Sequence, residues 1–268
     1  MNIQQYTDMH LDINHSCDGF SPDIFTIAPE TDVLLITGDT FNNAISTVDF
    51  IYDKMAKKLL PHQTLIYLFG NHEFYDCPME KAYEYAFSRV DENPQVVFLT
   101  HDRPHVKGDV VFIGDTLWTD YQYGLDPVLT KLHCKNYMSD HSCIIKDNRL
   151  FTPDDAHQLH KITMASLRAH LKTYSDKKIV MASHHSPSLL SINPKYYGHA
   201  SNGAYVSSIL EKCDEFHVIK YCFHGHVHDK VEKQIHGVWL CANPFGYMKW
   251  YGGHYENDNF EVNRVFSI

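Results

Sequence analysis

Five short groups of His, Asp and Asn residues are the part of the chain whose residue types and spacing could do chemistry. In chain order they are Asp8-Met9-His10, Gly38-Asp39, Gly70-Asn71-His72-Glu73, His184-His185 and His224-Gly225-His226-Val227-His228. Imidazole nitrogens, carboxylates and amide oxygens bind divalent transition metals. The groups supply enough such atoms for two ions, and two ions about 3.5–4 Å apart are a common device for displacement at phosphate esters. The residues therefore predict a dinuclear metal site that acts on phosphate esters.

Apolar runs rich in β-branched residues come directly before four of these groups. The runs cover residues 32–37, 65–69, 179–183 and 218–223. Short runs of this kind are typical of buried strands. Because an α/β fold builds its sites beyond the carboxyl ends of its strands, we expect these four strand ends to gather the groups at one edge.

The other elements alternate between strands and helices. The pattern predicts strands at residues 3–7, 96–99 and 110–113 and near Val231, Val238 and Val262, and helices at 45–60, 79–90 and 153–174. The strands at 96–99 and 110–113 are expected to pair with each other. Helices that come early and strands that cluster late predict two stacked sheets with helices outside. Residues 115–150 lack clean periodicity and are expected to form an insertion near the active site.

Length and composition restrict the class of protein. The chain has 268 residues and a formal net charge of −10, and its length predicts a single domain. The seven cysteines are scattered, which predicts reduced thiols in a cytoplasmic protein. The first ten residues have no apolar core, so no secretory signal is expected, and no run is long enough to span a membrane. An acidic chain is a poor candidate for binding long nucleic acid, which needs clustered Lys and Arg.

The groups differ in how specific they are. Histidine is common here, 20 of 268 residues, so a single His-x-His or Asp-x-His pair is expected by chance. The run Gly-Asn-His-Glu should arise only about once in 10⁵ positions at average residue usage. A strand-to-helix turn would explain Gly70 and Asn71 but not His72. The conjunction of all five groups in one order carries the prediction of a metal site.

The five groups in this order resemble the calcineurin-like metallophosphoesterase superfamily, whose pattern is D-x-H, G-D, G-N-H-E/D, H and G-H-x-H. Segments 116–120, 138–140, 183–188 and 243–247 are similar to a widespread bacterial branch described only as metallophosphoesterases. The resemblance covers nearly the whole chain. It implies an α/β fold, specifically a four-layer α/β/β/α sandwich of two mixed β-sheets flanked by helices.

Transferred to this sequence, the resemblance implies seven metal ligands. The first ion is expected at Asp8, His10 and His228, the second at Asn71, His184 and His226, and Asp39 is expected to bridge them. His184 is preferred to His185 because it lies nearer the strand end and matches the first His of the family's HH-x-P pattern. The mixed oxygen and nitrogen donors suit Mn²⁺, Fe²⁺ or Fe³⁺, Zn²⁺ or Co²⁺.

The expected reaction is attack on phosphorus by a hydroxide that bridges the two ions, because coordination can lower the pKa of water to about 7. His72 is not needed as a ligand and is expected to be the catalytic residue that protonates the leaving oxygen. Glu73 is expected to orient a neighbour or to begin a helix. The substrate is expected to contact Asn71, His72, Asp140, Tyr196 and Asn202.

The sequence also bears on the substrate. Protein phosphatases of the family carry GD-x-x-DRG, whose Arg holds phosphate, and residues 38–44 lack that Arg. We therefore expect a small phosphoester as substrate, with phosphodiesters favoured. A phosphomonoesterase, a protein phosphatase and a non-catalytic scaffold of the same fold remain alternatives, and the oligomeric state is open. Five aromatic residues could wall a base or another planar group, but for each one alone ordinary packing is the favoured interpretation. They are Trp118, Tyr121, Tyr123, Tyr196 and Tyr197.

Overall fold

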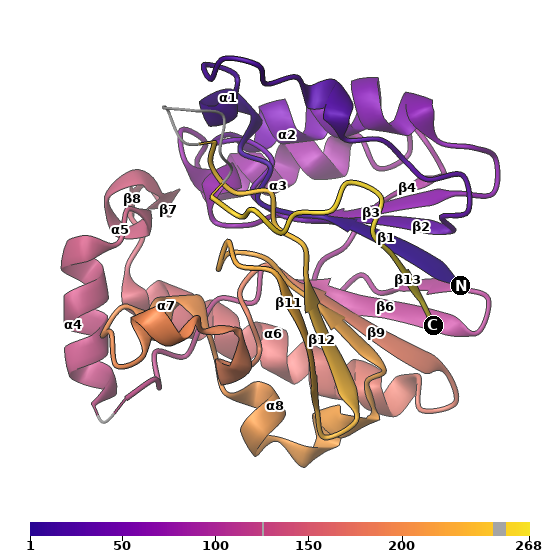
Figure 1. The fold of residues 1–268 in the computed structure, drawn as a ribbon. Coiled ribbons are helices and arrows are strands. Elements are labelled where there is room, and N and C mark those ends of the chain that lie inside the picture. The colour runs from indigo at the N-terminus through magenta and orange to yellow at the C-terminus, as the bar shows by residue number, and fades with distance from the viewer. Residues whose placement is uncertain (125, 249–255) are drawn as a thin grey trace.

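Two β-sheets lie face to face and carry helices on both outer sides (Figure 1). The computed structural model describes residues 1–124, 126–248 and 256–268. The arrangement is the expected α/β/β/α sandwich, because each sheet buries one face against the other sheet and one against helices.

The first sheet is built from the amino-terminal half of the chain and the last strand. Its order is β13-β1-β2-β3-β4. The strands are β1 (Asn2–Tyr6), β2 (Val33–Thr37), β3 (Thr64–Leu68), β4 (Val96–Phe98) and β13 (Val265–Ser267). β1 to β4 are parallel and β13 runs antiparallel to β1, so four carboxyl ends meet at one edge.

The second sheet has the order β11-β12-β10-β9-β6-β5. The strands are β5 (His105–Lys107), β6 (Val110–Asp115), β9 (Lys178–Ser183), β10 (Tyr221–Phe223), β11 (Val231–Ile235) and β12 (Val238–Ala242). The four inner strands are parallel, and the two edge strands are antiparallel to their neighbours. Both sheets are therefore mixed.

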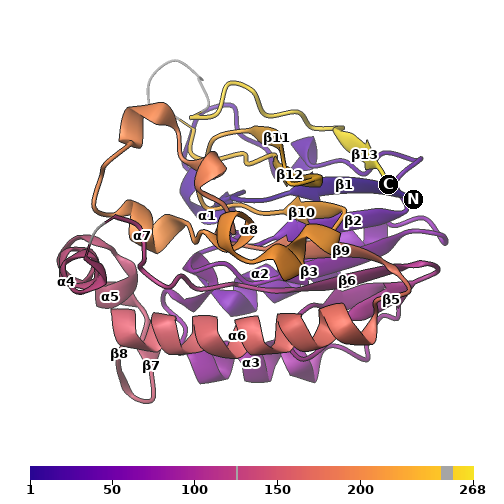
Figure 2. The same cartoon turned by 90° about the horizontal axis from the view of Figure 1, so that it is seen from below.

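Helices α2 (Ala44–Phe50) and α3 (Met79–Ser88) cover the first sheet, and α6 (Pro153–Thr173) runs along the second sheet (Figure 2). α2 continues as a π-helical turn (Ile51–Met55) and a 3₁₀ turn (Ala56–Lys58). α6 begins with a capping box, in which Thr152 and Asp155 satisfy each other's backbone N–H groups, and Pro153 occupies its first turn as expected. None of the helices in the described ranges is long and apolar enough to cross a membrane.

The remaining short elements lie beyond the carboxyl ends of the strands or on the surface. They are α1 (Leu11–Asn14), α4 (Pro127–Tyr137), α5 (Asp140–Cys143), the hairpin β7 (Ile145–Lys146) and β8 (Arg149–Leu150), α7 (Asn202–Tyr205), α8 (Ile209–Lys212), and 3₁₀ turns at Pro22–Ile24, His72–Phe74, Leu189–Ser191, Pro194–Tyr196 and Asp214–Val218. α4, α5 and α7 lie together at the end of the molecule opposite to the two termini (Figure 1). We call α4, α5 and α7 with the Pro194–Tyr196 turn the cap. Two of its helices, α4 and α5, come from residues 115–150, the segment expected to be an insertion.

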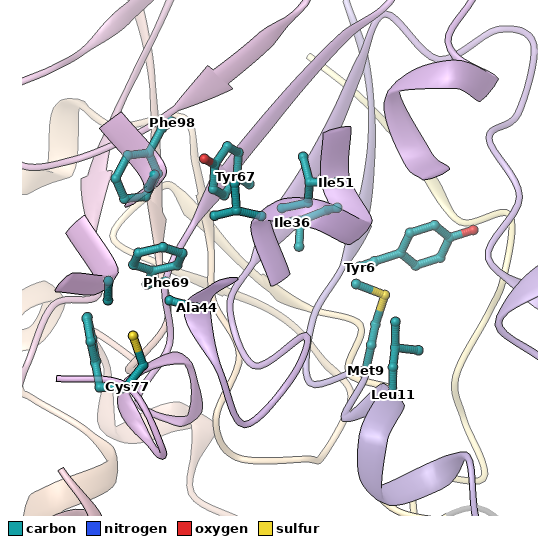
Figure 3. Packing of buried hydrophobic residues seen from close by; sticks show 14 of the residues in the cluster. Tyr6, Met9, Leu11, Ile36, Ala44, Ile51, Tyr67, Phe69, Cys77 and Phe98 are labelled. Carbon is teal, nitrogen blue, oxygen red and sulfur yellow. The ribbon is translucent and has the colours of Figure 1, made fainter. Parts of the chain in front are cut away.

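Three buried apolar clusters fill the three spaces between the four layers. Alternate residues of β1 to β3 point to opposite faces. Tyr6, Ile36 and Tyr67 pack under the helices (Figure 3), whereas Ile3 and Leu35 pack against the second sheet. Each large side chain buried in this way contributes about 1.5–3 kcal/mol to folding. These clusters hold the strand ends in fixed positions.

The predicted pairing of residues 96–99 with 110–113 is wrong. β4 extends the first sheet beside β3, and β6 lies in the second sheet, where it forms a hairpin with β5. The hairpin turns at Gly108, whose φ of 63° suits glycine. β5 was not predicted because its residues, His105, Val106 and Lys107, are too few and too polar to give a strand signal.

Three predicted boundaries also differ. The strand expected from residue 218 begins only at Tyr221, because Asp214–Val218 forms a 3₁₀ turn first. The α-helix expected to reach residue 60 ends at Phe50, where the π-helical turn begins. The last strand starts at Val265 rather than near Val262. Hydrophobicity extends through such irregular turns, so the apolar pattern alone does not locate these ends.

Candidate metal centre

The predicted ligand groups lie where the strands of both sheets end. Asp8 follows β1, Asp39 follows β2, Asn71 follows β3, His184 follows β9 and His226 follows β10. Five of the predicted ligands have left-handed backbone, with φ of 53° at Asp8, 42° at His10, 54° at Asp39, 69° at His226 and 51° at His228. Such strain persists only where the surrounding structure imposes it, and it clusters at functional sites.

Two glycines let the loops from neighbouring strands approach closely. A Cβ on Gly38 would lie 2.4 Å from Gly70 N, and a Cβ on Gly70 would lie 2.1 Å from Asp39 Oδ1. Both distances are far below van der Waals contact. The glycines of the Gly-Asp and Gly-Asn-His-Glu motifs are therefore required by the close approach of the two loops that carry Asp39 and Asn71.

A first cluster consists of Asp8, His10 and His228, which each offer one donor atom, all within 4.8 Å of one another. His228 Nε2 lies 3.3 Å from Asp8 Oδ1 and 3.2 Å from His10 Nε2. Asp8 and His10 are fully buried. The three side chains come from the first sheet and the second sheet, so the packing of the two sheets assembles the cluster.

A second cluster consists of Asp39, His184 and His226. His184 donates from Nδ1 to the Thr37 carbonyl at 2.8 Å, which leaves Nε2 facing Asp39 Oδ2 at 3.2 Å and Asn71 Oδ1 at 3.0 Å. A hydrogen bond of this kind at the outer nitrogen is how proteins fix the orientation of a metal-binding imidazole.

Asp39 belongs to both sides of the site. Its donor atoms also cluster with those of His10 and His72. Asp39 Oδ2 lies 3.2, 3.8 and 3.9 Å from the Nε2 atoms of His184, His72 and His10. His226 Nε2 is buried without a hydrogen-bond partner among the described residues. A buried acceptor beside converging carboxylate and imidazole atoms is the environment that a divalent cation would satisfy.

The pKa values of the clustered residues also favour a bound cation. Burial opposes protonation of His228, yet hydrogen bonds to Asp8 and Glu256 raise its pKa to about 10. Burial likewise opposes protonation of His184, and the Asp39 charge raises its pKa to about 9. The pKa of Asp39 lies well below its usual range because nearby imidazoles outweigh its burial. The carboxylates thus favour positive charge in this space, which metal ions would supply.

Asn71 is held by Asp140 of the cap and by Tyr75. Its Nδ2 donates to Asp140 Oδ1 at 2.8 Å and to Tyr75 Oη at 3.2 Å, so its Oδ1 is directed toward the second cluster. Tyr75 also donates to Asp140 Oδ1 at 2.7 Å. Asp140 is buried and lies behind Asn71 as seen from the cluster. Its expected contact with substrate remains a prediction.

His72 lies beside both clusters at the edge of the site. Its backbone N–H donates to Asp39 Oδ1 at 3.0 Å, and its Nδ1 donates to Asn42 Oδ1 at 2.5 Å. Its ring packs against the rings of His10 and Tyr75, with centroids 4.6 and 4.3 Å away. These contacts turn Nε2 toward the Asp39 carboxylate, which lies 3.8 Å away.

His185 is placed differently from its neighbour His184. His185 donates from Nδ1 to the Thr116 carbonyl at 3.1 Å, and its ring packs against Trp118 and His226. Burial and the neighbouring His184 lower the pKa of His185 to about 4, so the ring is neutral. The structure brings His184, not His185, into the cluster with Asp39.

Two glutamates support the site. Glu73 accepts hydrogen bonds from the backbone N–H groups of Asp39, Thr40 and Gly70 at 2.7–2.9 Å, and thereby ties two loops together. Burial and the Asp39 charge raise the pKa of Glu73 to about 7. Glu256 accepts from His228 Nδ1 at 2.7 Å. Glu256 was not predicted, because it lies 28 residues from His228 and outside every motif.

A cavity of about 590 Å³ opens beside His226 and His228. Tyr196 and Asn202, both predicted to contact substrate, line this cavity. Asn202 Nδ2 donates to the Tyr196 carbonyl at 2.7 Å, so it also fixes the loop. Tyr205, which stacks on the His226 ring at 4.5 Å, was not predicted. Trp118 and Tyr121 are buried in the core and do not wall the cavity.

A sandwich of two mixed sheets that gathers Asp, His and Asn donors at its strand ends is suited to bind metal ions. The profile of the calcineurin-like phosphoesterases matches residues 1–230, and the chain belongs to that family. The protein is therefore a metal-dependent phosphoric ester hydrolase.

One solved structure in particular supports the fold. Phosphopantetheinyl hydrolase (PptH) from Mycobacterium tuberculosis is 17% identical with a TM-score of 0.65, over 92% of this chain and 89% of that one. A putative 5′-nucleotidase from Staphylococcus aureus, solved with α-ketoglutarate, is 13% identical with a TM-score of 0.49, over 92% of this chain and 49% of that one. No curated protein matches the sequence.

Proposed function

We propose that the protein is a dinuclear phosphoesterase that hydrolyses a small phosphoester, with phosphodiesters favoured. The observation that carries the proposal is the position of Asp39, whose carboxylate is shared by clusters on either side. One carboxylate can give an oxygen to each of two ions. Asp8, His10 and His228 would hold the first ion, and Asn71, His184 and His226 the second.

Two such ions supply a nucleophile at neutral pH and neutralise charge on the phosphate. The remaining task for the chain is to protonate the leaving oxygen. His72 suits this task because Nδ1 is held by Asn42 at 2.5 Å and Nε2 lies 3.8 Å from Asp39 Oδ2. A general acid must lie within reach of the atom that it protonates and have a fixed orientation.

The charge of the cavity supports the preference for diesters. Among the described residues that line it, none is Lys or Arg. A dianionic monoester gains from a charge-assisted bond to such a cation, whereas a monoanionic diester needs only the metal ions. The missing Arg after Asp39 points the same way.

The test is a comparison of matched mono- and diesters that share one leaving group, such as p-nitrophenyl phosphate and bis(p-nitrophenyl) phosphate. The metal-free protein is loaded separately with Mn²⁺, Zn²⁺, Co²⁺ and Mg²⁺. We expect metal-dependent hydrolysis with kcat/KM for the diester at least equal to that for the monoester. A strong preference for the monoester, or efficient turnover of a phosphoserine peptide, rejects the substrate assignment. If neither ester is hydrolysed with any of the four metals, the proposed phosphoesterase function is rejected.

A further inference from the structure

Exposed apolar side chains lie on α4 and at Tyr196 and Tyr197, and two of them, Tyr137 and Tyr196, line the cavity. They are Val128, Leu129, Leu132 and Tyr137 of α4, exposed by 72, 63, 56 and 75%, and Tyr196 and Tyr197, exposed by 48 and 65%. We call these six residues the apolar rim. Single exposed apolar residues are ordinary, but a contiguous patch on a protein surface marks a place where something binds.

The apolar rim is continuous with the cavity through α4. Leu129, His133 and Tyr137 are spaced four residues apart, so they form one row along the helix. His133 and Tyr137 line the cavity, and Leu129 extends the row outward by one turn. Leu132 and Val128 lie beside Leu129 at helical spacing. The row, with Leu132 and Val128 beside it, therefore forms a track that links the cavity to the exposed apolar residues of α4, and His133 is its one polar member.

The charges around the cavity restrict what it can hold. The cavity lining that the structure describes includes two carboxylates and no Lys or Arg. Glu256 is engaged by His228, and Asp229 accepts from Asn193 Nδ2 at 2.9 Å. Lys195 lies outside the lining and packs on the ring of Tyr196 at 4.8 Å. A second anionic group of the substrate would therefore meet two carboxylates and no Lys or Arg among the described residues of this lining.

We propose that the organic group of the substrate is an uncharged amphiphile, whose polar part occupies the cavity and whose apolar chain lies along the apolar rim. This inference rests on the proposed phosphoesterase function and names its substrate class. A partner protein or a second copy bound on the rim would cover Tyr137 and Tyr196 and with them the entrance to the site. An apolar chain that belongs to the substrate uses the same surface without that conflict.

The test uses n-alkyl p-nitrophenyl phosphates with methyl, butyl and octyl chains, each below its critical micelle concentration. All have one negative charge and one leaving group, so only the chain differs. We expect kcat/KM to rise at least about tenfold from methyl to octyl. Full burial of the chain would give roughly fourfold for each added methylene, so the expected total corresponds to a chain that is only partly buried. A chain of butyl length that ends in a carboxylate should react more slowly than butyl itself.

The variant Leu132→Asp places a charge on the track without opening the core. We expect it to lower the octyl-to-methyl ratio of kcat/KM by about threefold to tenfold, because a carboxylate disfavours a bound alkyl chain. The matched control is Val218→Asp, which changes a residue 55% exposed on another surface and should leave the ratio unchanged.

A flat series in the wild-type protein, or a ratio that Leu132→Asp leaves unchanged, overturns the inference. Sedimentation velocity tests whether a second copy of the chain binds on the apolar rim. A dimer that Leu132→Asp dissociates would also overturn the inference. If the methyl ester is not hydrolysed with any metal, the proposed phosphoesterase function fails instead. A methyl ester that reacts in a flat series rejects the amphiphile alone.

Discussion

The donor edge, where Asp8, Asp39 and His184 converge, and the cap differ in how strongly the fold determines them. At the donor edge the side chains are buried, the backbone is strained, and neighbouring loops touch at Gly38 and Gly70. In the cap, α4 exposes several large apolar side chains. Enzymes commonly hold their chemistry on a rigid scaffold and place binding residues on surface segments, and the donor edge and the cap differ in the same sense.

The two regions meet at one point. Asp140 of α5 receives hydrogen bonds from Asn71 and Tyr75, and Tyr75 packs on the His72 ring. The cap thus contributes to the orientation of a predicted ligand and stabilises the neighbour of the predicted acid. This contact is the place where the separation between the two regions can be tested.

The largest expected effect concerns His72 at the donor edge. His72→Ala should keep its metal content and lose roughly 10²–10⁴-fold in kcat, the usual contribution of a general acid. The loss should be smaller for esters with very good leaving groups, which need no proton. Metal analysis and a leaving-group series measure both outcomes. A variant that loses metal would make His72 a ligand and not an acid.

The next effect contrasts the two regions by stability. Leu34 is fully buried in β2, and Leu132 is 56% exposed in α4. Leu34→Ala should lower the free energy of unfolding by about 2–5 kcal/mol, because it leaves a cavity. Leu132→Ala should change it by less than about 0.5 kcal/mol. Urea unfolding of both variants measures the difference. Equal losses would show that the exposed face of α4 is packed in solution.

The smallest effect concerns the contact between the regions. Asp140→Asn should weaken binding of one of the two ions by about 10–100-fold, because it replaces the charged acceptor that orients the Asn71 amide with a weaker, neutral one. Asp115→Asn is the matched control. Asp115 is also a buried carboxylate, but it contacts His101 and Thr163 outside the site. Metal titration with thermal melting separates the two roles. Unchanged affinity in Asp140→Asn would contradict the positioning role.

Much of the fold could be predicted because it depends on local patterns. Buried parallel strands are continuous apolar runs, and polar groups that follow such runs must lie at the same edge. The ligand groups that end β2, β3 and β9 could be placed in this way. The pairing of β4 and β6 could not, because two short strands close in sequence can join different sheets.

The structure of the cap could not be predicted from the sequence, for a physical reason. α4 carries apolar residues on its exposed face, so its hydrophobic pattern does not indicate which side packs. The contact between Asp140 and Asn71, 69 residues apart, and that between Glu256 and His228 depend on tertiary packing alone. A motif position can suggest that Asp140 lies near the site, but only the folded chain shows which atom it touches.

The measurement that tests the central claim most directly is the metal content of the wild-type protein and of Asp39→Asn after reconstitution with Mn²⁺. The shared position of Asp39 predicts two ions per wild-type chain and a lower occupancy of both sites in Asp39→Asn, because the shared negative charge is removed. A wild-type protein that binds no transition metal, or an Asp39→Asn variant that retains two ions with unchanged affinity, would contradict the account.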